Sequence, residues 1–278
     1  MIFNNFGFNR VAGSLALVPT PTPTPTPTIT PTPVPGIISD SVMIWLDPAN
    51  ASSYNGGNIS SGTGAVGTWN SVSGSTNNVA PFTIYRYSGG LTKSANWFST
   101  TGDFRFQTTN HLPDPPAGLW TIEMWVNPTL KRQTNWSLFT QQVGTPNSIN
   151  YLLSNAYQGG GLNLYAGGFA NGVYRLSPSG LAIPVNAGWK HIVGTASTGS
   201  NGTYTIYYNG VQQVQSTNIG TIGTSTSTTS LTFINNDTGQ NGGSWEASWG
   251  QVRMYSRPLT AAEVLNNFNV TKAIYGVA

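Results

Sequence analysis

A run of alternating proline and threonine divides this chain of 278 residues. Eight of its 18 prolines stand between Pro19 and Pro35, and most of them are followed by threonine. Proline fixes φ, lacks the amide hydrogen that a sheet ladder needs and keeps the preceding residue out of the helical region, which predicts polyproline II. At about 3.1 Å per residue such a tract would reach roughly 50 Å. We therefore expect a stiff linker over residues 19–36, with docking to an aromatic groove or O-glycosylation as alternative uses.

The linker separates an N-terminal arm, residues 1–18, from a large domain, residues 37–278. The arm is too short to fold alone, and its aromatic side chains Phe3, Phe6 and Phe8 have no local partner. We expect these three residues to anchor the chain in another protein. The domain consists of short alternating or apolar runs separated by Gly, Asn, Ser and Pro, which predicts an all-β, two-sheet antiparallel jelly-roll sandwich.

The alternation places the strands of this sandwich. We expect strands at Ser41–Asp47, Phe82–Tyr87, Asp103–Gln107, Trp120–Asn127, Ser137–Gln142, Ile149–Ser154, Leu162–Ala166, Val173–Leu176, Trp189–Ala196, Tyr204–Tyr208, Val211–Ser216, Leu231–Ile234 and Ser248–Ser256. The dipeptide Asn209-Gly210 predicts a two-residue type I′ hairpin. One short C-terminal helix is predicted from the capping box of Thr260 and Glu263, with an apolar stripe that comprises Leu259, Val264, Leu265 and Phe268.

Composition excludes several classes of protein. Only 7% of the residues are charged, against roughly 25% in an average domain, and the net charge is +3. Nucleic-acid binding would need clustered basic residues, which the pairs Lys131-Arg132 and Arg253 with Arg257 do not supply. The chain has no Cys and therefore no disulfide or thiolate site. The sequence contains no run of 18 apolar residues that could span a membrane as a helix. The apolar run Val11–Val18 is short and does not indicate a clear export signal.

Three parts of the domain resemble a known family. They are IWLDPANASSYNGG with WNSVSGS near the start, WTIEMWVNPT in the middle, and WKHIVGTASTGSNGTYTIYYNGV with the C-terminal GGSWEASWGQVRMYSRPLTAAEVLNNFNVTKAIYG. These segments resemble laminin-G-like, concanavalin A-like lectin jelly-roll modules of surface proteins and bacteriophage structural proteins. The resemblance covers about 240 residues. It implies a sandwich that commonly binds carbohydrate or mediates adhesion, sometimes with calcium, although fold alone establishes none of these functions.

Catalysis is not expected. Bacterial β-glucanases of this fold place a nucleophile and an acid on alternate residues of one strand, about 5 Å apart. In WTIEMWVN, the residues two and four positions after Glu123, on the same face of the strand, are Trp125 and Asn127 and not carboxylates. We therefore expect Glu123 to be an exposed strand residue or a core hydrogen-bond partner. His191 is expected to be structural, and His111 lies in a proline-bound loop without a nucleophile motif. We therefore expect that the protein is not an enzyme and has no catalytic residue.

The densest group of oxygen ligands is the predicted loop Asn235–Asn241 with Glu246. Asx side chains that stabilise a long turn explain this group, with metal or sugar contacts as the alternative. We expect no bound metal or other cofactor, although calcium stays open. For carbohydrate, which needs aromatic faces beside polar groups, the candidate residues are Asn236, Asp237, Asn241 and Trp245. Other loop aromatics considered are Tyr54, Trp136 and Tyr157, whereas Trp45, Trp120 and Trp189 are expected in the core.

Together these features predict a non-enzymatic protein at the surface of a tailed-phage virion, as a capsid decoration or fibre. The N-terminal arm would bind other virion proteins, and the sandwich would bind host cell-surface glycans. We expect a homo-oligomer that contacts neither nucleic acid nor membrane. The alternatives are a purely structural decoration protein and a cellular secreted adhesin.

Overall fold

A computed structural model describes residues 36–54, 56–72, 81–108, 119–130, 136–142, 149–155, 163–170, 173–177, 180–197, 202–217, 231–237 and 245–278. The N-terminal arm and residues 19–35 of the linker lie outside these ranges, and so do His111, Tyr157 and Asn241. The predictions made for them, including the anchoring role of Phe3, Phe6 and Phe8, stay predictions.

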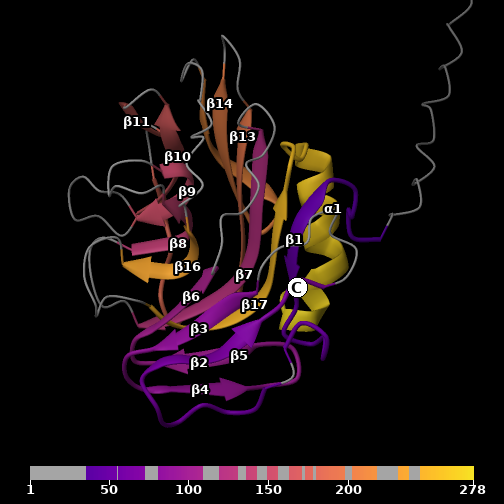
Figure 1. The fold of residues 1–278 in the computed structure, drawn as a ribbon. Helices are drawn as coiled ribbons and strands as arrows, with labels where there is room; N and C mark the ends of the chain where they lie inside the picture. The colour runs from indigo at the N-terminus through magenta and orange to yellow at the C-terminus, as the bar shows by residue number, and fades with distance from the viewer. Residues whose placement is uncertain are drawn as a thin grey trace, which may run out of the picture. The chain divides into compact units, whose positions relative to one another are not determined.

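The described strands form two antiparallel sheets (Figure 1). Sheet A has eight strands, in the order β15 (Val211–Ser216), β14 (Thr203–Tyr208), β13 (Lys190–Ser197), β7 (Trp120–Leu130), β17 (Glu246–Tyr255), β5 (Phe98–Thr101) and β4 (Gly90–Lys93), with β1 (Val42–Leu46) also paired to β17. Sheet B has nine, in the order β11 (Val173–Leu176), β10 (Asn163–Ala170), β9 (Ile149–Asn155), β8 (Trp136–Gln142), β16 (Leu231–Asp237), β6 (Phe104–Thr108), β3 (Phe82–Arg86) and β2 (Gly64–Trp69), with β12 (Leu181–Ala182) paired to β10. The predicted all-β sandwich is confirmed.

Alternation along the strands builds the core between the sheets. In β6, Phe104 and Phe106 are buried in this core, whereas Arg105 and Gln107 between them are half-buried on the other face. Aromatic rings from both sheets meet there, for example Trp69 of β2 and Phe98 of β5, whose centroids are 4.7 Å apart in an edge-on arrangement. Burial of each such side chain stabilises the fold by roughly 1.5–3 kcal/mol before its entropy cost.

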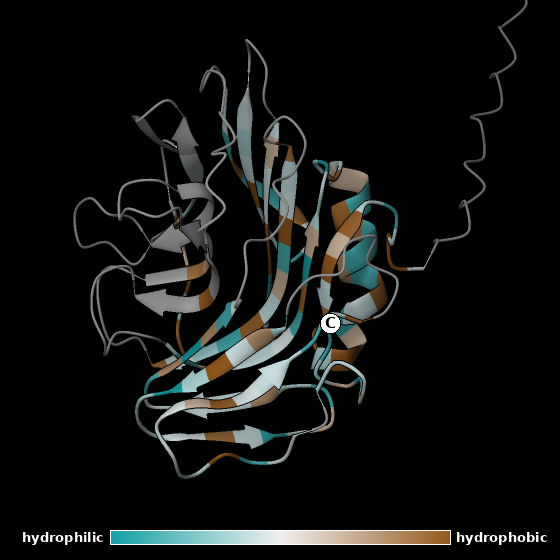
Figure 2. Cartoon of the chain, in the orientation of Figure 1, coloured by the Kyte–Doolittle hydropathy of each residue, from teal (hydrophilic) through white to brown (hydrophobic). Residues whose placement is uncertain are grey.

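The helix α1 (Ala261–Thr271) lies on the face of sheet A that points away from sheet B, beside β1 and β17 (Figure 1). The predicted capping box is present, because Thr260 and Glu263 bond each other's backbone amides. Hydrophobic and hydrophilic residues alternate along α1 (Figure 2). Val264 and Phe268 are buried as expected, but Leu265 is 44% exposed, so its place in the apolar stripe is wrong. The polar residues Asn267 and Thr271 are buried instead.

The C-terminus continues from α1 into a short 3-10 helix, η2 (Lys272–Tyr275). Gly276 ends it with a left-handed backbone, φ 67°, a conformation that glycine adopts without strain. Among the helices of the described residues, none has the length and apolar character needed to cross a membrane.

Every predicted strand is present, and the hairpin at Asn209-Gly210 has the two positive φ values, 50° and 79°, that a type I′ turn requires. The structure adds four strands that the pattern did not indicate: β2, β4, β5 and β12. These strands are short, contain glycine or consist mainly of Ser and Thr, so they carry little hydrophobic alternation.

Candidate functional site

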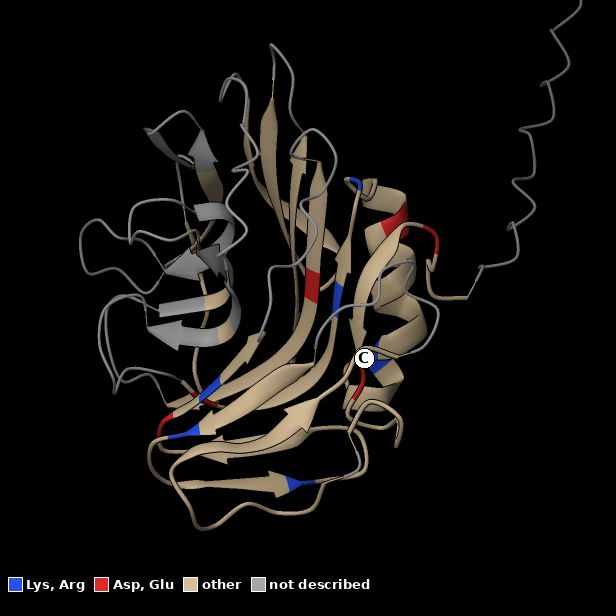
Figure 3. Ribbon diagram, in the orientation of Figure 1, with Lys and Arg blue, Asp and Glu red and all other residues tan. Residues whose placement is uncertain are grey.

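The richest group of ionisable side chains lies on the outer face of sheet A, beneath α1. Glu123 on β7 stands opposite Arg253 on β17 (Figure 3) and next to His191 on β13. Its Oε1 lies 2.7 Å from His191 Nε2 and 3.5 Å from Arg253 Nη1. Its Oε2 accepts hydrogen bonds of 2.9 Å from Tyr255 Oη and Asn267 Nδ2. We call these five residues the carboxylate cluster.

The carboxylate cluster is sealed from solvent: all five residues are buried, and Glu123 is 1% exposed. Burial alone would raise the pKa of Glu123, but the charge of Arg253 and the hydrogen bonds from His191 and Tyr255 outweigh it and lower the pKa to about 2. Glu123 is therefore ionised at neutral pH. Of its two predicted environments, the core hydrogen-bond partner is confirmed and the exposed strand position is wrong.

The geometry of Glu123 does not match that of a glycosidase. Hydrolysis with retention requires two carboxyl groups about 5 Å apart, with access to the sugar between them. The carboxylate cluster contains one carboxylate, held by donors on both oxygens and covered by α1. The arrangement joins three strands of sheet A to the helix.

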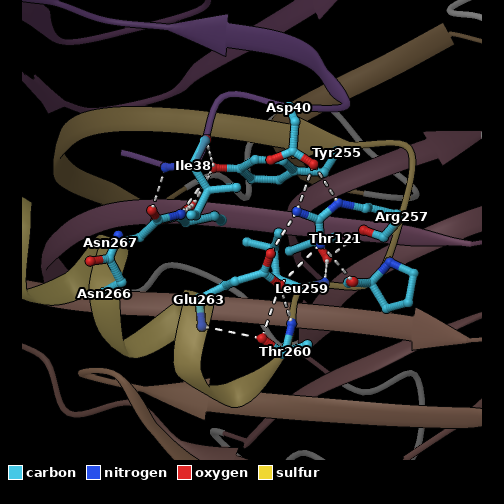
Figure 4. Close-up of polar contacts among 12 residues, drawn as sticks. Ile38, Asp40, Thr121, Tyr255, Arg257, Leu259, Thr260, Glu263, Asn266 and Asn267 are labelled. Carbon is cyan, nitrogen blue, oxygen red and sulfur yellow. Dashed lines mark hydrogen bonds and ion pairs between the residues drawn. The ribbon is translucent and has the colours of Figure 1, made fainter. Parts of the chain in front are cut away.

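The carboxylate cluster extends to the start of the described domain, residues 36–41, which we call the leading segment (Figure 4). Asn267 Oδ1 accepts a 2.9 Å hydrogen bond from Ile38 N, and Tyr255 Oη, which donates its proton to Glu123, lies 3.2 Å from Ile38 O. Asn266 Nδ2 bonds Gly36 O at 3.0 Å. The point at which the linker ends is thus attached to the C-terminal helix.

A second set of contacts attaches the leading segment at the start of α1 (Figure 4). Arg257 forms ion pairs with Asp40 at 2.8 Å and with Glu263 at 2.7 Å. The hydrogen bonds from Arg257 and Thr260 lower the pKa of Glu263 to about 2. Thr121 Oγ1 donates to Arg257 O and accepts from Leu259 N, both at 2.8 Å, and so connects the turn before the helix to β7.

An aromatic and basic group lies on the outer face of sheet B. Tyr85 on β3 pairs with Arg105 on β6, and the guanidinium carbon of Arg105 is 5.2 Å from the ring centre of Tyr85 and 5.4 Å from that of Tyr87. All three side chains are half-buried. No helix among the described residues covers this face. We call these residues the tyrosine–arginine cluster.

The tyrosine–arginine cluster was not predicted, because the search for sugar-binding aromatics considered only loops. The signal is present in the strands themselves. In FTIYRY, Phe82 and Ile84 alternate with Thr83 and Tyr85, and only the first pair reaches the core. A tyrosine at a polar position of an alternating strand indicates an aromatic ring on the outer face.

The residues predicted to bind sugar do not gather into one exposed site. Trp245 is 0% exposed, so its expected exposure is wrong: its ring fills the core between the sheets. Tyr54 is also buried in the core, and its Oη donates to Gly57 O at 2.7 Å. Asn236 and Asp237 belong to β16 instead of a loop, paired with Ser137 and Trp136 of β8.

The side chains of Asn236 and Asp237 and all of Asn241 lie outside the described residues, so their predicted contacts with sugar or calcium stay predictions. Glu246 Oε1 accepts a 2.9 Å hydrogen bond from Gly102 N. Within the described part of the chain, no three His, Asp or Glu side chains lie close enough together to share a metal ion. Trp120 is buried as expected, but Trp45 and Trp189 are only half-buried, so their core assignment is wrong.

Comparison with known proteins supports this description of the fold. Residues 98–265 match the family model Laminin_G_3 of the concanavalin A-like lectin/glucanases superfamily, which confirms the resemblance. Domain 4 of AbnA, a GH43 extracellular arabinanase from Geobacillus stearothermophilus in complex with arabinotriose, has a TM-score of 0.58 at 16% identity, with 82% of this chain and 98% of that chain covered. A search of curated proteins found no match.

A second similar structure is Trypanosoma rangeli sialidase in complex with 2,3-difluorosialic acid, with a TM-score of 0.55 at 14% identity. The similarity covers 91% of this chain but 37% of the sialidase chain, so this chain spans little more than a third of that enzyme. At these identities the similarities show a shared fold alone.

Proposed function

Because this chain belongs to the concanavalin A-like lectin/glucanases superfamily, we propose that its sandwich is a carbohydrate-binding module without catalytic activity. Two findings support the proposal. The glutamate on β7 is sealed beneath α1 with one carboxylate in its cluster, which leaves it unsuited to glycoside hydrolysis. The arabinanase domain with the same fold was solved in complex with arabinotriose.

The observation that carries the proposal is the tyrosine–arginine cluster on the outer face of sheet B, which no helix of the described residues covers. Sugar recognition needs aromatic rings for the apolar side of the ring and hydrogen-bond donors for the hydroxyl groups. Tyr85 and Tyr87 supply the rings, with the guanidinium group of Arg105 held against both of them. Thr83 and Gln107, paired next to them, add neutral polar groups on the same face.

The test is a glycan array and titration calorimetry with the full chain, using arabino-oligosaccharides as the first soluble probe. We expect weak binding that strengthens on multivalent display, and no release of reducing ends. Tyr85→Ala should weaken binding about threefold to tenfold, the equivalent of one aromatic contact. Gln213→Ala is the control, since Gln213 is exposed on β15 of sheet A, on a different sheet from the tyrosine–arginine cluster.

If no glycan binds even to multivalent protein, a structural decoration role replaces the proposal. If sugars bind and are cleaved, the absence of catalysis is wrong.

The setting of the module is part of the same proposal: the surface of a tailed-phage virion, where host glycans are bound. The N-terminal arm, with Phe3, Phe6 and Phe8, would hold the chain on other virion proteins, and the Pro-Thr linker would project the sandwich from them. A homo-oligomer would multiply a weak affinity. The attachment of the leading segment to α1 fits this role, because it fixes the sandwich to the end of its linker.

A further inference from the structure

Two tryptophans form a partly exposed corner at the edge of the helix-covered face of sheet A. Trp97 precedes β5, and Trp189 precedes β13. Their ring centres are 5.5 Å apart, with an angle of 64° between the planes. Most other described tryptophan side chains are fully buried, as Trp69 and Trp249 illustrate. We call this pair the tryptophan corner.

The tryptophan corner is supported from beneath. The ring centres of Trp189 and of Tyr275 in η2 are 4.6 Å apart. Tyr275 in turn stacks on Trp125, with 4.5 Å between the ring centres and 24° between the ring planes. Tyr275 Oη accepts a 2.8 Å hydrogen bond from Gln251 N, and its ring occupies the space where a side chain at Gly250 would lie. The ring of Trp189 is thus fixed before any ligand arrives, which reduces the entropy cost of binding.

Lys93 and Asp47 form a pair of opposite charges close to the turn that carries Trp97. The turn that carries Trp97 is closed by a 2.8 Å hydrogen bond from Ser94 N to Trp97 O. Lys93 Nζ donates to the carbonyl oxygens of Ser94 and Ala95 in that turn. Asp47 interacts electrostatically with Lys93, and its Oδ2 accepts a 2.9 Å hydrogen bond from Gln251 Nε2. The two charges balance each other.

We propose that the tryptophan corner is a second carbohydrate subsite, one that takes a neutral pyranose or furanose ring. The inference rests on the proposed function. Partly exposed indole faces offer stacking to the apolar side of a sugar, and the neighbouring Lys93 and Asp47 offer a donor and an acceptor to its hydroxyl groups. Because these charges cancel, the site has no preference for an anionic sugar.

This subsite and the tyrosine–arginine cluster lie on outer faces of different sheets, so one sugar ring cannot occupy both. Phe98 points into the core, which directs the neighbouring Trp97 to the outer face of sheet A. The tyrosine–arginine cluster lies on the outer face of sheet B. One module would therefore bind two glycan chains, and this raises avidity on a dense glycan surface.

The test compares Trp97→Ala with wild type in titrations with arabinotriose and with a neutral hexose trisaccharide, followed by calorimetry and by tryptophan fluorescence. Trp97 is the informative position because Trp189 also packs on η2, so its removal could disturb the fold. We expect Trp97→Ala to weaken binding threefold to tenfold with an unchanged melting temperature, and Trp97→Phe to restore most of the affinity. Tyr85→Ala should leave the ligand-induced fluorescence change of the tryptophan corner intact.

The outcomes separate the two proposals. Suppose that wild type binds sugar, that Tyr85→Ala abolishes this binding and that Trp97→Ala leaves it unchanged. The proposed subsite is then wrong, and the proposed function stands. If Trp97→Ala alone weakens binding, the subsite stands and the tyrosine–arginine cluster is wrong. Binding of only anionic glycans, binding of an apolar peptide in place of sugar, or no binding of wild type to any sugar overturns the subsite.

Discussion

Glu123 brings a negative charge beneath α1, and its neighbours compensate that charge. Replacement by glutamine keeps the shape but leaves Arg253 buried beside a neutral group. Breaking one partner of a buried pair typically costs about 3–5 kcal/mol, so we expect Glu123→Gln to lower the free energy of unfolding by that amount in urea titrations. Glu263→Gln is the comparison, since that carboxylate is partly exposed and should contribute less. A loss below 1 kcal/mol for Glu123→Gln would contradict the assigned role.

The same residue makes stability depend on acid pH. The pKa of Glu123 is about 2 in the folded protein, against an ordinary value of 4.5. Between these values the unfolded chain binds more protons than the folded one, so the contribution of Glu123 is present above pH 4.5 and lost as the pH falls toward 2. Urea titrations from pH 6 to pH 2 should show this decline in the free energy of unfolding. The free energy of unfolding of Glu123→Gln should change less with pH. Equal slopes for the two proteins would show that other groups govern acid unfolding.

Single residues also show what sequence patterns could and could not predict. Alternation identified Glu123 as unpaired with a second carboxylate, because that information is local to one strand. The burial of Trp245 could not be predicted, since it depends on how β17 packs against sheet B. For that reason Trp245→Ala would leave a large cavity and could not separate sugar binding from folding.

At the scale of elements, α1 contacts both the leading segment and sheet A and so connects them. Asn267 on its buried side bonds Ile38, Glu123 and Tyr255. We expect Asn267→Ala to destabilise the fold by about 2–3 kcal/mol, because it leaves buried polar groups without partners. The Ile38 amide should also exchange faster with deuterium.

Asn269→Ala is the matched control for this variant. Asn269 is a residue of the same type on the same helix, and its side chain is exposed. Its removal should change stability by less than about 0.5 kcal/mol and leave exchange at Ile38 unaltered. Similar effects of the two substitutions would mean that the helix, and not the Asn267 contacts, holds the leading segment.

Elements differed in how well they could be predicted. The hairpin at Asn209-Gly210 and the capped helix have strong local signals, and both are confirmed. Strands β4 and β5 depend on tertiary contact: an added Cβ at Gly89 would lie 1.7 Å from Thr101 O, so a close backbone approach that only glycine permits brings them together. No periodicity in the sequence carries that information.

For the whole molecule, the two outer faces of the sandwich differ in the elements and side chains that they carry. The outer face of sheet A is largely closed by α1 and η2, with the tryptophan corner at its edge. The outer face of sheet B carries the tyrosine–arginine cluster without a covering helix among the described residues. The face under α1 holds the contacts to the leading segment, so we expect the outer face of sheet B to meet glycans first.

The last prediction separates folding from anchoring. The buried hydrophobic residues of the described core all lie at or after Val42. Deletion of residues 1–18 should therefore leave the thermal unfolding of the sandwich and its glycan titrations unchanged. The deletion removes Phe3, Phe6 and Phe8, each of which could contribute roughly 1.5–3 kcal/mol when buried in a partner, so incorporation into purified virions should be lost. Replacement of the Pro-Thr tract by a Gly-Ser linker of equal length is the control and should preserve incorporation. Full incorporation of the truncated chain would place the anchor on the sandwich and contradict the role of the arm.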